Sequence, residues 1–134
     1  MKSRSLYIVF GLGNPGAEYE RTRHNAGRSA VLLFIKDNNF PSPEENKKMQ
    51  ALVSEGAIGK INIAAILPET FMNKSGVTAK NLKFKNKKLI AESVVVVHDD
   101  LDLPLGTIKI VKNRGSAGHK GVESVMRALK TKDF

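Results

Sequence analysis

Short apolar runs, separated by polar and glycine-rich segments, dominate the pattern along the chain. Such runs, rich in β-branched residues and bounded by turn residues, predict strands. The predicted strands are residues 6–10, 51–58, 61–67, 94–97 and 107–111. Gly59 and Lys60 separate two of them as a hairpin turn would, and Pro68 ends the second. The four valines at 94–97 are typical of a strand that is covered on both faces.

Helical periodicity appears between these runs. We predict helices at residues 23–37, 74–84 and 122–130, and a surface connection at residues 38–45, which hold two prolines. Thr22 is placed to cap the first helix. The apolar face of that helix should contain Ala26, Ala30, Leu33 and Phe34. Strands that alternate with helices predict an α/β fold in one domain, residues 1–134. The expected architecture has three layers, α/β/α, around a mixed, mostly parallel central sheet.

The composition adds a strong positive charge. Twenty-two Lys and Arg face 13 Asp and Glu, a formal net charge of +9. This charge favours a partner with closely spaced phosphates, although many basic proteins bind no nucleic acid. No apolar run reaches the roughly 18 residues of a membrane-spanning helix. The chain has no cysteine, which excludes disulfides and fits a reducing cytoplasm, where we expect the protein to act.

Residues 11–16, Gly-Leu-Gly-Asn-Pro-Gly, directly follow the first predicted strand and fit the dinucleotide pattern G-x-G-x-x-G. Pro15 removes a backbone donor where a pyrophosphate would need one, and a further loop follows instead of a helix. Asp37 and Glu44, the acidic candidates for the ribose, stand at no strand end. We therefore expect the glycines to form a turn that holds Asn14 over a cleft, with a plain tight turn as the alternative.

A histidine and a group of acids form the candidate catalytic chemistry. His24 falls in the first turn of a predicted helix, where the helix dipole favours the neutral ring that a general base needs. Asp99 lies in the segment His-Asp-Asp-Leu-Asp, residues 98–102, at the carboxyl end of the 94–97 strand. A carboxylate there could fix the tautomer of His24 if the two strands are parallel. The same acids could also form a metal site.

Two further segments suggest binding. Phe71, Met72 and Asn73 place an aromatic ring beside a carboxamide, which suits a nucleotide or a peptide amide, but core packing and a helix cap would also explain them. The glycine-rich loop 113–121 carries His119 and Lys120 and could bind the phosphate backbone of a nucleic acid. A merely solvated charged face is the alternative for that loop.

The order of these motifs closely resembles the bacterial peptidyl-tRNA hydrolase family. The motifs are G-L-G-N-P-G-x-x-Y at 11–19, T-R-H-N-A-G at 22–27, F-M-N-x-S-G at 71–76, H-D-D-L-D-L-P at 98–104 and Gly118-His119. The resemblance implies an α/β/α monomer that acts in translation and hydrolyses N-blocked aminoacyl-tRNA. It implies tRNA as the partner, no membrane, and no metal or organic cofactor.

The resemblance also implies roles for individual residues. His24 resembles the base that activates water, Asp99 the carboxylate that supports it, and Asn14 the group that distinguishes blocked from free amino groups. The remaining positions are expected to contact the substrate or its tRNA: Tyr19, Phe71, Met72, Asn73, His119 and Lys120. Among these, Asn73 is the candidate to polarise the ester carbonyl.

This sequence departs from the family's pattern in two ways. Lys120 stands where the family usually has asparagine, and we expect its ammonium group to reach a tRNA phosphate or to point to solvent. The chain ends at residues 131–134, where the family usually continues into another strand and helix, so we expect a C-terminally truncated domain that lacks both. Two rival functions remain: a catalytically weakened RNA-binding domain, favoured by the charge and the missing tail, and a nicotinamide-dependent enzyme based on residues 11–16.

Overall fold

The computed structural model describes residues 5–81, 92–100, 103–104 and 106–134. Their strands are β1 (Ser5–Gly11), β2 (Glu44–Asn46), β3 (Ala51–Ile58), β4 (Ile61–Pro68) and β5 (Val94–Val97). The helices are α1 (Ala26–Asp37), α2 (Gly76–Lys80) and α4 (Lys120–Leu129), with 3-10 turns η1 (Ala17–Tyr19), η2 (Arg23–Asn25) and η3 (Met72–Lys74). No helix in these ranges is long and apolar enough to cross a membrane.

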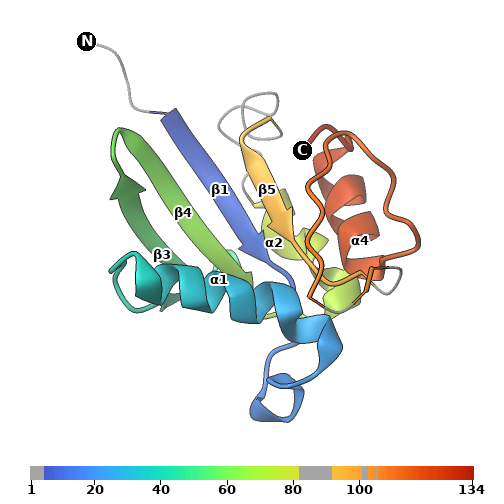
Figure 1. Cartoon of the computed structure of the whole chain (residues 1–134), viewed down its shortest axis with the longest axis horizontal. Coiled ribbons are helices and arrows are strands. Elements are labelled where there is room, and N and C mark those ends of the chain that lie inside the picture. The colour runs from blue at the N-terminus through green and yellow to red at the C-terminus, as the bar shows by residue number, and fades with distance from the viewer. Residues whose placement is uncertain (1–4, 82–91, 101–102, 105) are drawn as a thin grey trace.

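The five strands form one sheet in the order β2-β3-β4-β1-β5 (Figure 1). β1 is parallel to both β4 and β5, whereas β3 is antiparallel to β2 and β4, so the sheet is mixed as predicted, with two of its four pairings parallel. The predicted hairpin turn at Gly59 and Lys60 joins β3 to β4. Because β1, β4 and β5 run the same way, their carboxyl ends meet at one edge, the lower edge in Figure 1.

Alternating residues of the strands divide the core between the two faces of the sheet. Ile8 and Phe10 of β1 belong to the cluster that packs against α2 and α4. Ala65 and Leu67 of β4 belong to the cluster on the other face, which packs against α1. A period of two along a strand produces this division, because successive side chains point to opposite faces. The result is the three-layer α/β/α arrangement that the sequence predicts.

The predicted apolar face of the first helix is correct only for Phe34, which packs against the core; Ala26, Ala30 and Leu33 are exposed. In α1 the buried residues are Gly27, Val31 and Ile35, whereas Leu33 is 58% exposed. The cause is Gly27, at which an added Cβ would lie 2.0 Å from the carbonyl oxygen of Val97. α1 approaches β5 so closely at this point that only glycine fits. Val31 and Ile35 lie four and eight residues after Gly27, on the same face of the helix, and therefore also point toward the sheet.

The start of the helix also differs from the prediction. A 3-10 turn, η2, precedes α1, so His24 lies one turn before the α-helix proper. Thr22 has the extended backbone of a cap, but its hydroxyl donates to the carbonyl of Tyr19 (2.7 Å) and accepts no backbone N–H of the helix.

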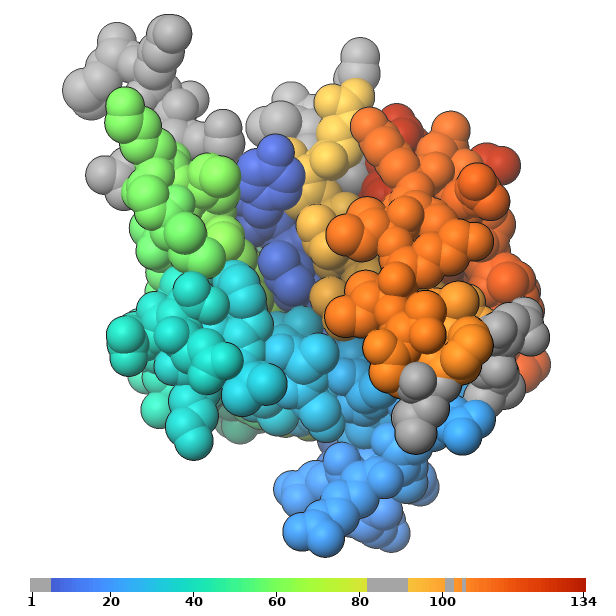
Figure 2. All heavy atoms as spheres, viewed as in Figure 1, coloured from blue at the N-terminus to red at the C-terminus, as the bar shows by residue number. Residues whose placement is uncertain are grey.

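Two other predicted elements need correction. Residues 107–111 form no strand: Ile108 is 88% and Ile110 95% exposed, and the segment lies on the surface in Figure 2 (orange). A strand needs a backbone partner, and none of the described segments pairs with this one. β5 is accordingly an edge strand of the described sheet, with Val95 45% exposed, so it is not covered on both faces.

The remaining elements fall near their predicted places. Within the predicted helix 74–84 the structure has α2 (Gly76–Lys80), while residues 82–84 lie outside the described part of the chain. α4 begins two residues before the predicted helix and ends at Leu129, beyond which Lys130 takes a left-handed backbone (φ 57°). The connection at residues 38–45 leads into the short strand β2, which the pattern did not predict.

Candidate active site

His24 and Asp99 meet at the sheet edge where the parallel strands end. Nδ1 of His24 lies 2.9 Å from both carboxylate oxygens of Asp99. The carboxylate can only accept, so Nδ1 donates and the lone pair of Nε2 stays available for a proton. The Asp99 side chain is 4% exposed while that of His24 is 52% exposed. The pair therefore has a buried, oriented end and an open, reactive end.

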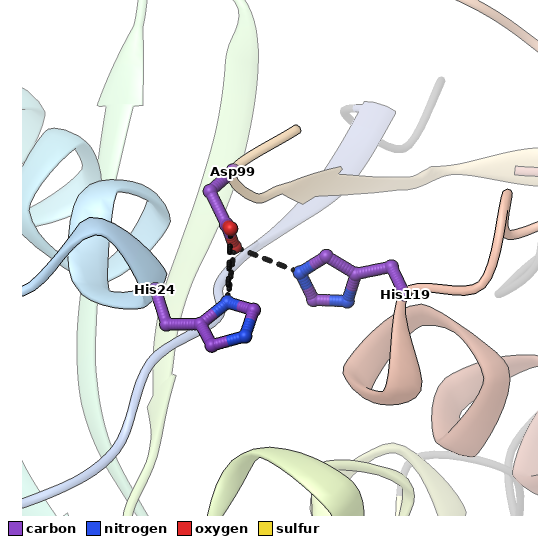
Figure 3. Close-up of side chains that lie close together, drawn as sticks. All are labelled: His24, Asp99 and His119. Carbon is purple, nitrogen blue, oxygen red and sulfur yellow. Dashed lines mark hydrogen bonds and ion pairs between the residues drawn. The ribbon is translucent and has the colours of Figure 1, made fainter. Parts of the chain in front are cut away.

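His119 lies beside His24 and approaches the same carboxylate (Figure 3). Its Nε2 lies 2.8 Å from Oδ1 of Asp99, and its side chain is 8% exposed. Its Nδ1 accepts the backbone N–H of Val122 (3.2 Å), so His119 caps the start of α4. A ring nitrogen that accepts carries no proton, which places the proton of a neutral ring on Nε2, facing Asp99. Asp99 thus receives hydrogen bonds from two imidazoles.

The environment shifts the pKa values of Asp99 and His119. Burial alone would raise the pKa of the Asp99 carboxyl, but hydrogen bonds from His24 and His119 outweigh it and lower that pKa below the usual 3.8. Burial lowers the pKa of His119 below the usual 6.5, partly opposed by its hydrogen bond to Asp99. Near neutral pH the centre is therefore a carboxylate with a neutral His119.

Asn14 is fixed by contacts on both its backbone and its side chain. The side chain of Asn25 accepts from Asn14 N (2.8 Å) and donates to Asn14 O (2.9 Å). The side-chain oxygen of Asn14 accepts the backbone N–H of Met72 (2.6 Å). This contact fixes the orientation of the amide, so the NH₂ group of Asn14 points the other way as a donor. Asn25, which is 2% exposed, is a positioning residue that the sequence reasoning missed.

A cavity of about 330 Å³ connects several of these groups; its lining residues are Asn14, Tyr19, Thr22, Arg23, His24 and Asp99. Phe71 is 55% exposed, and its ring meets the edge of Tyr19 at a centroid distance of 6.1 Å. Residues of the segments 11–19, 22–27 and 98–104 thus line the cavity, and Phe71 and His119, from two further segments, contact lining residues. A second cavity, about 510 Å³, lies along α1 between Gly16 and Leu32 and involves neither His24 nor Asp99.

The other predicted site residues lie around this cavity without lining it. The Met72 side chain is 7% exposed and packs in the core, so only its backbone N–H reaches Asn14. Asn73 is exposed in η3, next to Met72. Lys120 is exposed as the first residue of α4. Asp102 lies outside the described residues, and Asp100 lies at the surface.

His24, Asp99 and His119 offer one ligand atom each within 4.8 Å of one another, a spacing that a metal ion could use. The hydrogen bonds argue against that use. Ligation through Nε2 of His119 would move its proton to Nδ1, opposite the N–H of Val122, and two donors would then face each other. These residues do not fit a resident metal in the conformation observed.

A histidine oriented by a buried carboxylate, with its second nitrogen open to a cavity, can take a proton from water. This α/β scaffold and this site are those of a hydrolytic enzyme. The family model described as "Peptidyl-tRNA hydrolase" matches residues 8–134, and the chain belongs to that family.

Individual relatives agree with this assignment. The chain is 42% identical over 132 residues to the "Peptidyl-tRNA hydrolase" of Thermodesulfovibrio yellowstonii, covering 96% of this chain and 68% of that protein. For the Brevibacillus brevis protein of the same name the identity is 41%, with coverages of 96% and 67%. The crystal structure of the Acinetobacter baumannii enzyme superposes with a TM-score of 0.89 at 28% identity, covering 100% of this chain and 67% of that one. The chain thus spans about two thirds of the length of these relatives.

Proposed function

We propose that this chain hydrolyses the ester between a peptide and tRNA, with His24 as the general base. The observation that carries the proposal is the 2.9 Å contact of His24 Nδ1 with the buried Asp99, which leaves Nε2 facing an open cavity. Family membership supports the substrate class. A positioned base contributes about 10²–10⁴ in rate.

In the proposed reaction Nε2 of His24 takes a proton from water as the water oxygen bonds to the ester carbonyl carbon. The carbonyl becomes an oxyanion, for which Asn73 at the neighbouring turn is the candidate donor. When the carbon–oxygen bond to the ribose breaks, the imidazolium returns the proton to the departing ribose oxygen. Free tRNA and a peptide carboxylic acid result; the acid then releases its proton to solvent, and no side chain becomes covalently attached.

The orientation of Asn14 supports selectivity for blocked amino groups. Because Met72 N–H holds its oxygen, the amide of Asn14 is oriented with its NH₂ group away from that contact, where the group can donate to the substrate. An acylated nitrogen brings a carbonyl that accepts such a donor, whereas a free ammonium brings only donors. Aminoacyl-tRNA would therefore leave the Asn14 donor unpaired, at a cost that disfavours its binding.

Exposed cations next to the site support the choice of tRNA as partner. They lie on α4, on its C-terminal cap and on the segment before it: Lys109, Lys112, Arg114, Lys120, Arg127 and Lys130. A surface of this kind attracts a phosphate backbone. We further propose that the chain acts as a monomer in the cytoplasm, since one chain supplies His24, Asp99 and His119 together and charged tRNA occurs where translation takes place.

The test is single-turnover cleavage of N-acetyl-aminoacyl-tRNA by the whole chain and by His24→Ala. We expect the chain to cleave this ester and to leave free aminoacyl-tRNA intact, and His24→Ala to lose about 10²–10⁴ in rate while still binding tRNA. Binding without cleavage by the unaltered chain would favour the rival RNA-binding role. Cleavage that survives His24→Ala would remove His24 as the base.

A further inference from the structure

His119 makes two hydrogen bonds at once, and each depends on the other. Nδ1 accepts from the first turn of α4, through Val122 N, and Nε2 donates to Asp99. A neutral imidazole has one donor and one acceptor nitrogen, so the contact with Val122 decides which nitrogen faces Asp99 with a proton. The first turn of a helix therefore sets the tautomer of a ring that touches the catalytic carboxylate.

We propose that His119 is a positioning residue that couples the N-terminus of α4 to the orientation of the Asp99 carboxylate, and hence to His24. The proposal rests on the proposed function, since positioning has a catalytic consequence only if His24 is the base. Among the described residues, His24 and His119 are the groups that give the buried Asp99 carboxylate a hydrogen bond, and both bond Oδ1. With Oδ1 held by His119, the carboxylate keeps an oxygen aligned with Nδ1 of His24.

The surroundings of His119 support this positioning role. The ring of His98 packs against it at 4.7 Å, and Nδ1 of His98 is held by the carbonyl of Asp99 at 2.6 Å. Beneath it, a Cβ added to Gly121 would meet the ring at 3.1 Å and the sulfur of Met72 at 2.5 Å. The ring is thus confined by its neighbours, as positioning requires, and it offers little surface to a substrate.

Two substitutions separate the two hydrogen bonds. In His119→Asn the amide group takes the place of Nδ1 and can cap α4, because asparagine is a preferred cap, but it is too short to reach Asp99. In His119→Gln the longer side chain places its NH₂ near the position of Nε2, where it can donate to Asp99 without capping the helix. Ser116→Ala is the control, because Ser116 bonds Glu123 and Gly118 at the start of α4 and makes no contact with Asp99.

We expect His119→Asn to be the slower but more stable of the two His119 variants, and His119→Gln to be the faster but less stable one. His119→Asn should lower kcat about tenfold to a hundredfold, the effect of losing a hydrogen bond to a charged group, with KM unchanged. His119→Gln should stay within about threefold of the unaltered kcat but unfold at a lower urea concentration than His119→Asn. Ser116→Ala should lose some stability and no kcat. If kcat followed stability across all three variants, His119 would be only a cap and the proposal would be overturned.

Two measurements by NMR do not depend on turnover, so they remain decisive even if the chain proves inactive and the proposed function fails. Nitrogen shifts of the His119 ring should show the proton on Nε2; a proton on Nδ1 would overturn the proposal. The pKa of the Asp99 carboxyl, followed by carbon shifts, should rise in His119→Asn and stay low in His119→Gln. An equal rise in both variants would also overturn it.

Discussion

The side chain of Asn25 forms two hydrogen bonds with the backbone of Asn14, accepting from its nitrogen at 2.8 Å and donating to its oxygen at 2.9 Å. Asn25 directly follows His24 in the chain and is 2% exposed. One buried amide therefore fixes the distance between the loop after β1 and the turn that carries the proposed base. The relative position of Asn14 and His24 depends on this pair.

Replacing Asn25 by alanine should therefore impair both stability and activity. The change leaves a backbone donor and acceptor of Asn14 without partners, which should cost about 2 kcal/mol in the free energy of unfolding. Because Asn14 then shifts relative to His24, we expect kcat/KM to fall by about tenfold or more. Urea unfolding and single-turnover cleavage measure the two effects separately.

Asn38→Ala is the matched control for Asn25→Ala. Asn38 is exposed at the end of α1, where its amide donates to the carbonyl of Phe34. Losing this surface contact should change stability by no more than about 0.5 kcal/mol and leave cleavage unaltered. If Asn25→Ala cleaved at the same rate as Asn38→Ala, Asn25 would have no part in arranging the site.

Gly27→Ala should destabilise the fold more than any surface change. The added Cβ would lie 2.0 Å from the carbonyl oxygen of Val97; the backbone of α1 fixes the Cβ and the oxygen belongs to the backbone of β5, so neither can move without a shift of a whole element. We expect a loss of about 3 kcal/mol in the free energy of unfolding, the upper part of the range for overpacking. Gly115→Ala, whose Cβ meets nothing within 4 Å, is the control and should unfold like the unaltered chain.

The same glycine explains one limit of prediction from sequence. The strands β1, β3, β4 and β5 follow from apolar runs and turn residues, which are local signals. The buried face of α1 does not, because it depends on the approach of Gly27 to Val97, two residues far apart in the chain. Residues 107–111 have the composition of a strand, but a segment forms a strand only where another segment pairs with it, which its own composition does not reveal.

The candidate site shows a similar division. The meeting of His24 and Asp99 could be predicted, because both follow the carboxyl ends of strands that proved parallel. The position of His119 beside Asp99 could not be predicted from the sequence, because it depends on the hydrogen bond from Val122 N–H to Nδ1 of the ring. The sequence shows a histidine in a basic glycine-rich loop, and that setting pointed to contact with tRNA.

Stability should fall as the pH drops below about 6.5. In the folded chain burial keeps the pKa of His119 below its usual 6.5, so between these two values the unfolded chain binds the proton and the folded chain does not. The contribution of His119 is complete above pH 6.5 and is lost as the pH falls toward the lower, folded-state pKa. Asp99, whose folded pKa is below 3.8, adds a loss of the same sign at more acid pH.

Urea unfolding at pH 7.5 and pH 5.5 tests this dependence. His119→Gln, which has no titrating group at this position, should lose less stability between the two pH values than the unaltered chain. The comparison cancels the repulsion from other groups that gain charge, which both chains share. A loss that is equal in both chains would show that His119 does not titrate in the predicted sense.

Asp99→Asn should abolish most of the proposed activity while preserving the fold. The substitution keeps the shape of the side chain but removes the charge that favours the Nδ1–H tautomer of His24 and stabilises its protonated form. We expect kcat to fall by about 10²–10⁴ with little change in KM. Near-UV spectra and tRNA binding should match those of the unaltered chain, and retention of kcat would show that the carboxylate does not support the base.

Lys120→Asn tests whether Lys120 contacts a phosphate of the tRNA. Lys120 is exposed at the start of α4, next to His119, and the proposed phosphate contact would release a counterion from the RNA. Its loss should weaken binding and reduce the slope of log Kd against log salt by about one. Lys60→Asn removes the same charge from the hairpin between β3 and β4, at the edge of the sheet away from the site, and should leave the slope unchanged. If both variants gave the slope of the unaltered chain, Lys120 would point to solvent, and the other cations around α4 would have to account for the affinity.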